Sequence, residues 1–96
     1  MTVQVQVTET QQPLTTRIEK NIRKALDRHT ATTNLPRAIH NAINEVAANN
    51  QAQAARQGWE PHEIEGIRLI TCKVGAKVAA DLVDAGYMTA DEFLNA

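Results

Sequence analysis

The sequence predicts a mostly α-helical protein in which one N-terminal β-strand is followed by four helices. From residue 14 onward, apolar residues recur every three or four positions, which is the spacing of an amphipathic helix. Before that point the segment VQVQV, residues 3–7, alternates valine with glutamine, as a half-buried strand does. A chain of 96 residues is long enough for one domain, or for one small module with an appendage.

The strand expected at residues 3–7 has no second strand in the chain with which to pair. It is therefore a tail, an edge strand added to a partner's sheet, or half of a ribbon made by two copies of the chain. The sequence does not decide whether residues 1–12 form an ordered strand or a tail. The ribbon would make the protein a homodimer, and its dimerisation residues would be Val3, Val5 and Val7, which share one face of the strand.

Two amphipathic helices follow the polar connector at residues 8–13. The first is expected over residues 14–29, capped by Thr15 or Thr16. The second begins after Asn34, a favourable N-cap, with Pro36 in its first turn, where a missing N–H costs nothing. This helix is expected to run to Gln57 and to stop at Gly58.

Two further helices are expected in the C-terminal part. Pro61 and the acidic residues around it favour a helix start, and Gly86 is a suitable stop. Residues 67–74, IRLITCKV, are rich in β-branched residues and are compatible with a strand, but the apolar period favours a helix. Thr89 and Glu92 have the spacing of a capping box and predict a short final helix.

Charge differs between the two halves of the chain. Residues 1–50 carry six basic and four acidic side chains, whereas residues 51–96 carry four basic and seven acidic ones. Together with the break at Gly58, this asymmetry predicts two modules: a strand-helix-helix module over residues 1–57, and an acidic helical unit over residues 58–96. The acidic unit is suited to binding a protein partner.

Residues that carry chemistry are few. The single cysteine excludes an internal disulfide, and its apolar neighbours indicate that Cys72 is partly buried. The three histidines lack the spacing of metal ligands, and we find no G-x-S-x-G motif and no glycine-rich phosphate loop. We therefore expect no enzymatic activity, no metal and no cofactor. No apolar run approaches the roughly 18 residues of a membrane span, and no signal peptide is visible, so we expect a soluble cytoplasmic protein.

The order of strand, helix and helix within residues 2–50 resembles the ribbon-helix-helix family of DNA-binding proteins. In that family two chains pair their N-terminal strands into a ribbon that lies in the major groove. The resemblance implies a small dimeric DNA-binding protein, either a repressor or an accessory factor. It implies DNA contacts from the strand and from the start of the second helix, made by Gln4, Gln6, Thr8, Asn34, Leu35 and Arg37.

A second function remains open. The chain has a net charge of −1, which is unfavourable for non-specific DNA binding. The alternative is a small all-α protein-interaction module, such as a phage- or plasmid-borne inhibitor of a host complex. Its partner would be a protein rather than DNA.

Overall fold

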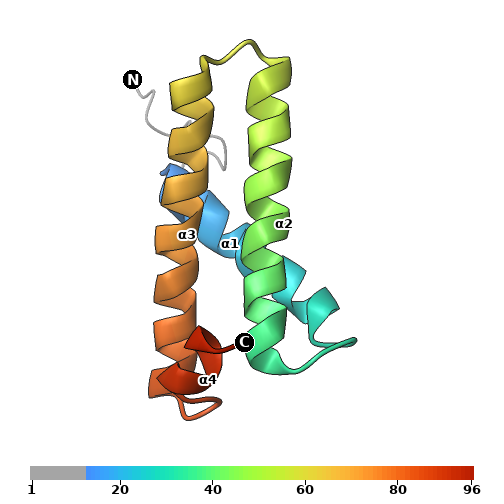
Figure 1. The fold of residues 1–96 in the computed structure, drawn as a ribbon, viewed down its shortest axis with the longest axis vertical. Helices are drawn as coiled ribbons and strands as arrows, with labels where there is room; N and C mark the ends of the chain where they lie inside the picture. Colours follow the sequence, from blue (N-terminus) through green and yellow to red (C-terminus); the bar gives the residue numbers. More distant parts are fainter. Residues whose placement is uncertain (1–12) are drawn as a thin grey trace, which may run out of the picture.

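The computed structural model describes residues 13–96, which form four helices. Helices α2 and α3 run antiparallel and side by side, α1 crosses behind them, and α4 turns back at the C-terminal end of α3 (Figure 1). The helices are α1 at Leu14–His29, α2 at Leu35–Arg56, α3 at Pro61–Asp84 and α4 at Ala90–Leu94.

The expected fold class, a β-strand followed by four helices, is wrong. Residues 13–96 form helices alone, and no strand occurs among them. The segment VQVQV, with Val3, Val5 and Val7, lies outside the described residues. Because α2 and α3 of the same chain bury the apolar side of α1, its core does not depend on a ribbon between two chains.

The caps that the sequence predicts for the starts of α1 and α2 had different outcomes. The expected cap of α1 by Thr15 or Thr16 is wrong, because the helix begins at Leu14 after Pro13 and has no side-chain cap. The cap of α2 is confirmed: the side-chain oxygen of Asn34 accepts a hydrogen bond of 3.0 Å from the backbone N–H of Arg37.

Two expectations for α3 and α4 are confirmed. Residues 67–74 are helical throughout, which confirms the preference for a helix there. The capping box of α4 is also confirmed, since the N–H of Thr89 donates to Oε1 of Glu92 over 2.8 Å and the N–H of Glu92 donates to Oγ1 of Thr89 over 3.1 Å. Gly86 follows α3 with a positive φ of 88°, a conformation that glycine adopts without strain.

One hydrophobic core joins the helices. Its fully buried large side chains are Ile18 and Ile22 from α1, Ile39 from α2 and Val78 from α3. Met88, beyond α3, belongs to the same core, and Phe93 of α4 packs against it. The module boundary predicted at Gly58 therefore falls in a turn, and the core extends across it.

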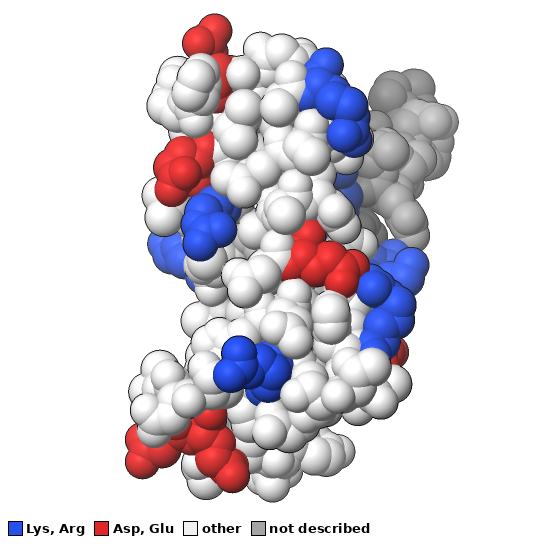
Figure 2. Space-filling model, turned by 45° about the vertical axis from the view of Figure 1, so that its right-hand side comes forward, with Lys and Arg blue, Asp and Glu red and all other residues white. Residues whose placement is uncertain are grey.

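The outer surface is polar and mixed in charge. Figure 2 shows basic and acidic side chains interspersed over the face that it presents. Within residues 13–96 no helix is both long enough and apolar enough to cross a membrane.

Candidate interaction surface

A network of four charged side chains joins α1 to α3. Arg23 of α1 contacts Glu19 over 3.0 Å and Asp81 of α3 over 3.2 Å. Lys77 of α3 lies 3.5 Å from Asp81 and 3.7 Å from Glu19. These charges neutralise one another within the chain, so we assign them to holding α1 against α3.

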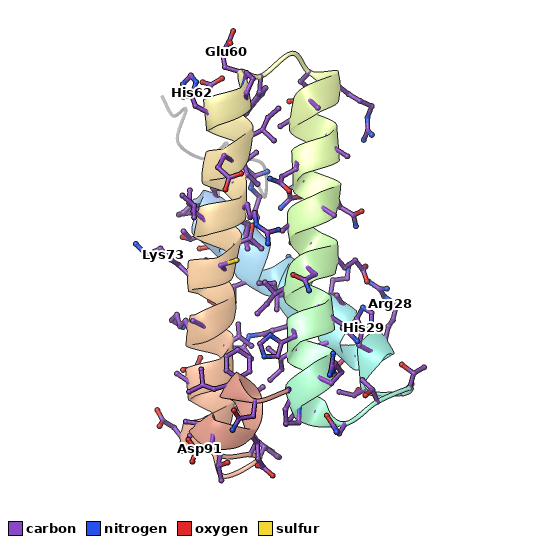
Figure 3. All side chains as sticks on the ribbon, in the orientation of Figure 1. Arg28, His29, Glu60, His62, Lys73 and Asp91 are labelled. Atoms are coloured by element: carbon purple, nitrogen blue, oxygen red, sulfur yellow. The ribbon has the colours of Figure 1, made fainter. Side chains whose placement is uncertain are left out.

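A second charged cluster joins the end of α1 to α2. Arg28 Nη2 donates to Glu45 Oε2 over 2.5 Å, and His29 Nε2 lies 2.8 Å from Glu45 Oε1. The hydrogen bond from Arg28 and then that from His29 hold the pKa of Glu45 below its ordinary value, while burial acts in the opposite direction. Arg28 and His29 lie beside α2 in Figure 3. The Glu45 carboxylate is thus occupied by partners from its own chain.

His40 holds α4 against α2. Its ring stacks on Phe93 with the ring centroids 4.3 Å apart and the planes 9° from parallel. Its Nε2 also lies 2.6 Å from the backbone carbonyl of Phe93. We therefore assign His40 a structural role, because its ring and its Nε2 atom both contact Phe93 of α4.

The described DNA-contact candidates lie at the start of α2. Asn34 uses its side chain to cap the helix, and Leu35 is half-buried against the core. Arg37 is exposed. A pocket at this end is lined by Asn34 and Pro36 together with Glu92 and Ala96 of the C-terminal segment, so a carboxylate lies near the helix start. Their role in DNA binding stays a prediction, and Gln4, Gln6 and Thr8 lie outside the described residues.

Two pockets lie beside α1 and α2, the larger with a mixed polar and apolar lining and the smaller with a mainly polar one. The larger, of about 280 Å³, combines amides such as Asn50 and Gln53 with Arg17 and the ring of Trp59. The smaller, of about 230 Å³, contains Lys24 and the Arg28–Glu45 pair. Both are open, and neither brings together groups of a recognisable catalytic arrangement.

The apolar pocket lies elsewhere, between α3 and α4. It has a volume of about 240 Å³, and Asp84 is its single charged lining residue. The other lining residues are all apolar: Ala76, Ala79, Ala80, Val83, Ala90, Phe93 and Leu94. Such a pocket suits an apolar side chain of a partner and offers little to a polar substrate.

This pocket continues onto an outward strip of α3. Leu69, Cys72, Ala76, Ala80 and Val83 follow one another at intervals of three or four residues, so they lie along one side of the helix. We call these five residues, together with the adjoining Leu94, the α3 face. Leu69 is 60% exposed and Leu94 is 72% exposed. Large apolar side chains so exposed on neighbouring elements are typical of an interaction surface.

Charges flank the α3 face. Lys73 projects from α3 on the side away from α2 (Figure 3). Asp84 lies eleven residues further on, which is about three helical turns, so the two lie on the same flank. Among residues 13–96 we find no ion pair for either side chain, in contrast to Lys77 and Asp81 on the α1 side.

Sequence reasoning missed this surface. The partial burial expected for Cys72 is wrong, because its side chain is exposed. Leu69 falls outside the apolar series 67, 70, 74, 78 and 82, which forms the core side of α3. The sequence did contain a signal for this surface, a second apolar series at positions 69, 76, 80 and 83. A helix that is apolar on two sides is expected to pack against something on each side.

The described part of the chain offers no metal-binding group of three or more histidine, cysteine or carboxylate side chains. No protein-family model, no curated protein and no solved structure matches the chain.

Proposed function

We propose that the protein is a small all-α protein-interaction module and that the α3 face is its binding surface. The observation that carries this proposal is the apolar pocket between α3 and α4. Beyond its lining residues, the exposed side chains of Cys72 and Leu69 lie on the same side of α3. The ion pairs that join α1 to α2 and to α3 are made within the chain, whereas the outer side of α3 leaves apolar surface uncovered. Catalysis is not part of the proposal.

DNA reading by an N-terminal strand stays a prediction, because Gln4, Gln6 and Thr8 lie outside the described residues. The described helices close the core of α1 within one chain. The net charge of −1 and the carboxylate near the start of α2 also favour a protein partner over a polyanion.

The test is site-specific photo-crosslinking of the full chain in cells that express it. A photoreactive phenylalanine derivative replaces Leu69 in one variant and Ala80 in another, since both positions are exposed on the α3 face. The matched control places the same group at Ala55, an exposed position of α2. We expect one discrete product from positions 69 and 80 and none from position 55.

Adding Ala76→Arg, which fills the middle of the α3 face with a long charged side chain, should abolish that product. Circular dichroism of the Ala76→Arg variant checks that it still folds. If positions 69 and 80 give no product, or if position 55 gives the same product, the α3 face is not the binding surface and the proposed function is wrong.

A further inference from the structure

The proposed function leaves the partner of the α3 face unspecified, and the pattern of residues along α3 restricts the choice. Small side chains, Ala76 and Ala80, occupy the middle of the face. Large exposed ones lie toward its ends, with Leu69 on one side and Tyr87, which is 70% exposed, beyond the other. A helix with this outline accepts a second helix closely at its centre and contacts it with large apolar groups at both ends.

The middle of the face is symmetric along the helix. Positions 76 and 80 lie equally far from position 78, Leu69 lies toward the start of α3, and Tyr87 follows its end, beyond Gly86. If a second, antiparallel copy of α3 is placed with its centre opposite position 78, alanines meet alanines in the middle. Leu69 of each copy then reaches the end that carries Tyr87 in the other. A two-fold interface requires this kind of self-complementarity, because every contact occurs twice.

The charges follow the same symmetry. Lys73 and Asp84 lie at nearly equal distances on either side of the junction between Val78 and Ala79, and on the same flank of α3. In the antiparallel arrangement Lys73 of one copy therefore lies opposite Asp84 of the other, and the reciprocal pair forms at the opposite end. No ion pair within residues 13–96 is found for either of these two side chains.

We propose that the α3 face is covered by the α3 face of a second copy of this chain, in an antiparallel two-fold dimer centred near Val78 and Ala79. This inference rests on the proposed function and names its partner. The dimer is formed by helices, and each copy keeps its own closed core. Its contacts are the alanines at the centre, Leu69 against the end marked by Tyr87, and two Lys73–Asp84 pairs.

The experiment measures the mass of the full chain by sedimentation equilibrium, from low micromolar to near millimolar concentration, for charge-reversal variants. Lys73→Glu places two acidic side chains opposite each other at both ends, and Asp84→Lys places two basic ones there. Because like charges repel in both symmetric pairs, we expect each single variant to raise the dimer dissociation constant at least about tenfold. The double variant Lys73→Glu/Asp84→Lys restores opposite charges and should recover the wild-type constant.

Arg56→Glu is the matched control, because it makes the same change of charge at an exposed site on α2, away from the α3 face. It should leave the dissociation constant within about twofold of wild type, as expected for a site remote from the interface. Circular dichroism of each variant excludes unfolding as the cause of dissociation. A wild type that stays monomeric throughout, a double variant that stays as weak as the singles, or a dimer weakened equally by Arg56→Glu overturns the proposal.

Crosslinking distinguishes this inference from the proposed function. A product from position 80 with the mass of two chains supports the dimer. A product that joins the chain to a different protein overturns the dimer and leaves the interaction function standing. With no product at all, both are lost.

Discussion

Gly75 lies in the contact between α3 and α2, against the side chain of Ile43. A Cβ atom added at this position would overlap Cδ1 and Cγ1 of Ile43, which is itself buried. In an open helix, alanine is preferred to glycine by about 1 kcal/mol. At position 75 the overlap reverses that preference. A packed core can accommodate the extra Cβ atom only if side chains adopt unfavourable rotamers or the backbone shifts, and both changes lower stability.

We expect Gly75→Ala to lower the free energy of unfolding by about 1–3 kcal/mol, the usual range for overpacking a core. Gly66→Ala, in the same helix, has no heavy atom within 4 Å of the added Cβ. That variant should therefore raise the free energy of unfolding by about 0.5–1 kcal/mol. Urea denaturation of both variants measures the two effects with opposite signs.

The contact with Ile43 can be isolated by a double variant. Ile43→Val removes Cδ1, so the loss of stability caused by Gly75→Ala should be smaller in the Ile43→Val background than in the wild-type background. Equal losses in the two backgrounds would show that Ile43 does not cause the effect.

At the scale of single residues, the sequence predicted what depends on near neighbours. The cap by Asn34 and the capping box of Thr89 and Glu92 involve groups three residues apart, and both are as expected. The exposure of Cys72 and the use of Gly75 as a contact point depend on which side of α3 meets α2. Local spacing does not fix that choice.

At the scale of helices, the junction of α1 and α2 depends on Glu45. The Arg28 guanidinium and then His29 hold the pKa of Glu45 below its ordinary value of 4.5 in the folded chain. The hydrogen bond to Glu45 and then its negative charge raise the pKa of Arg28, so the arginine stays charged over the whole acidic range. The unfolded chain therefore binds a proton at Glu45 more readily than the folded one.

The sign of the pH dependence follows from this shift. The contribution of Glu45 to stability is fully present above 4.5 and is lost as the pH falls through the lower pKa of the folded state. We expect Glu45→Gln to melt at a lower temperature than wild type at neutral pH. The difference should shrink as the pH is lowered well below 4.5.

Thermal melts across the acidic range measure this difference. Glu65→Gln is the control, because Glu65 is exposed and no ion pair is found for it in the described part of the chain. A deficit of Glu45→Gln that stays constant from neutral to acidic pH would show that the carboxylate does not act through its charge.

Helix positions were largely predictable because each apolar series is long. The series 67, 70, 74, 78 and 82 outweighed the β-branched composition of residues 67–74, and α3 runs through them without a break. The bounds of α1 match the expected residues 14–29, but its cap was less predictable, because the helix follows Pro13 and neither Thr15 nor Thr16 caps it. Terminal turns depend on a few weak interactions, and several residues compete for them.

At the scale of the molecule, the core extends across the Gly58 turn. Ile67, Val74 and Val78 of α3 are buried in it. Each contributes about 1.5–3 kcal/mol when fully buried, and a domain has only about 5–15 kcal/mol of net stability. We therefore expect a chain that ends at Gln57 to lose cooperative thermal unfolding. Circular dichroism during a melt is the measurement.

A chain that ends at Gly86 is the matched control, since it keeps α1, α2 and α3 and should still unfold cooperatively. Cooperative unfolding of residues 1–57 alone would show instead that the N-terminal module is an independent unit. That result would support the division of the chain at Gly58.

The architecture could be predicted only in part, for a physical reason. Periodicity shows that a helix has an apolar side, but it does not show which helix covers that side. The spacing of residues 14–29 predicted an amphipathic helix without naming its cover, and in the structure α2 and α3 cover it. The α3 face was missed for the same reason. The apolar residues on the outer side of α3 can be recognised as uncovered only when the structure shows that α1 and α2 pack against its other side.

The weak attachment of α4 allows this helix to unfold locally while the rest of the protein stays folded. This helix has five residues, and the stacking of His40 on Phe93 is the aromatic contact that ties it to α2. Short peripheral units open at a small fraction of the global unfolding free energy, so amide protons in α4 exchange with solvent while those around Ile22 and Ile39 remain protected. The pocket against α3 exists only in the closed form. A partner that fills the pocket therefore binds only the closed conformation and stabilises it. The amide exchange rate in α4 should fall as the pocket becomes occupied, so it measures how much of the protein is bound.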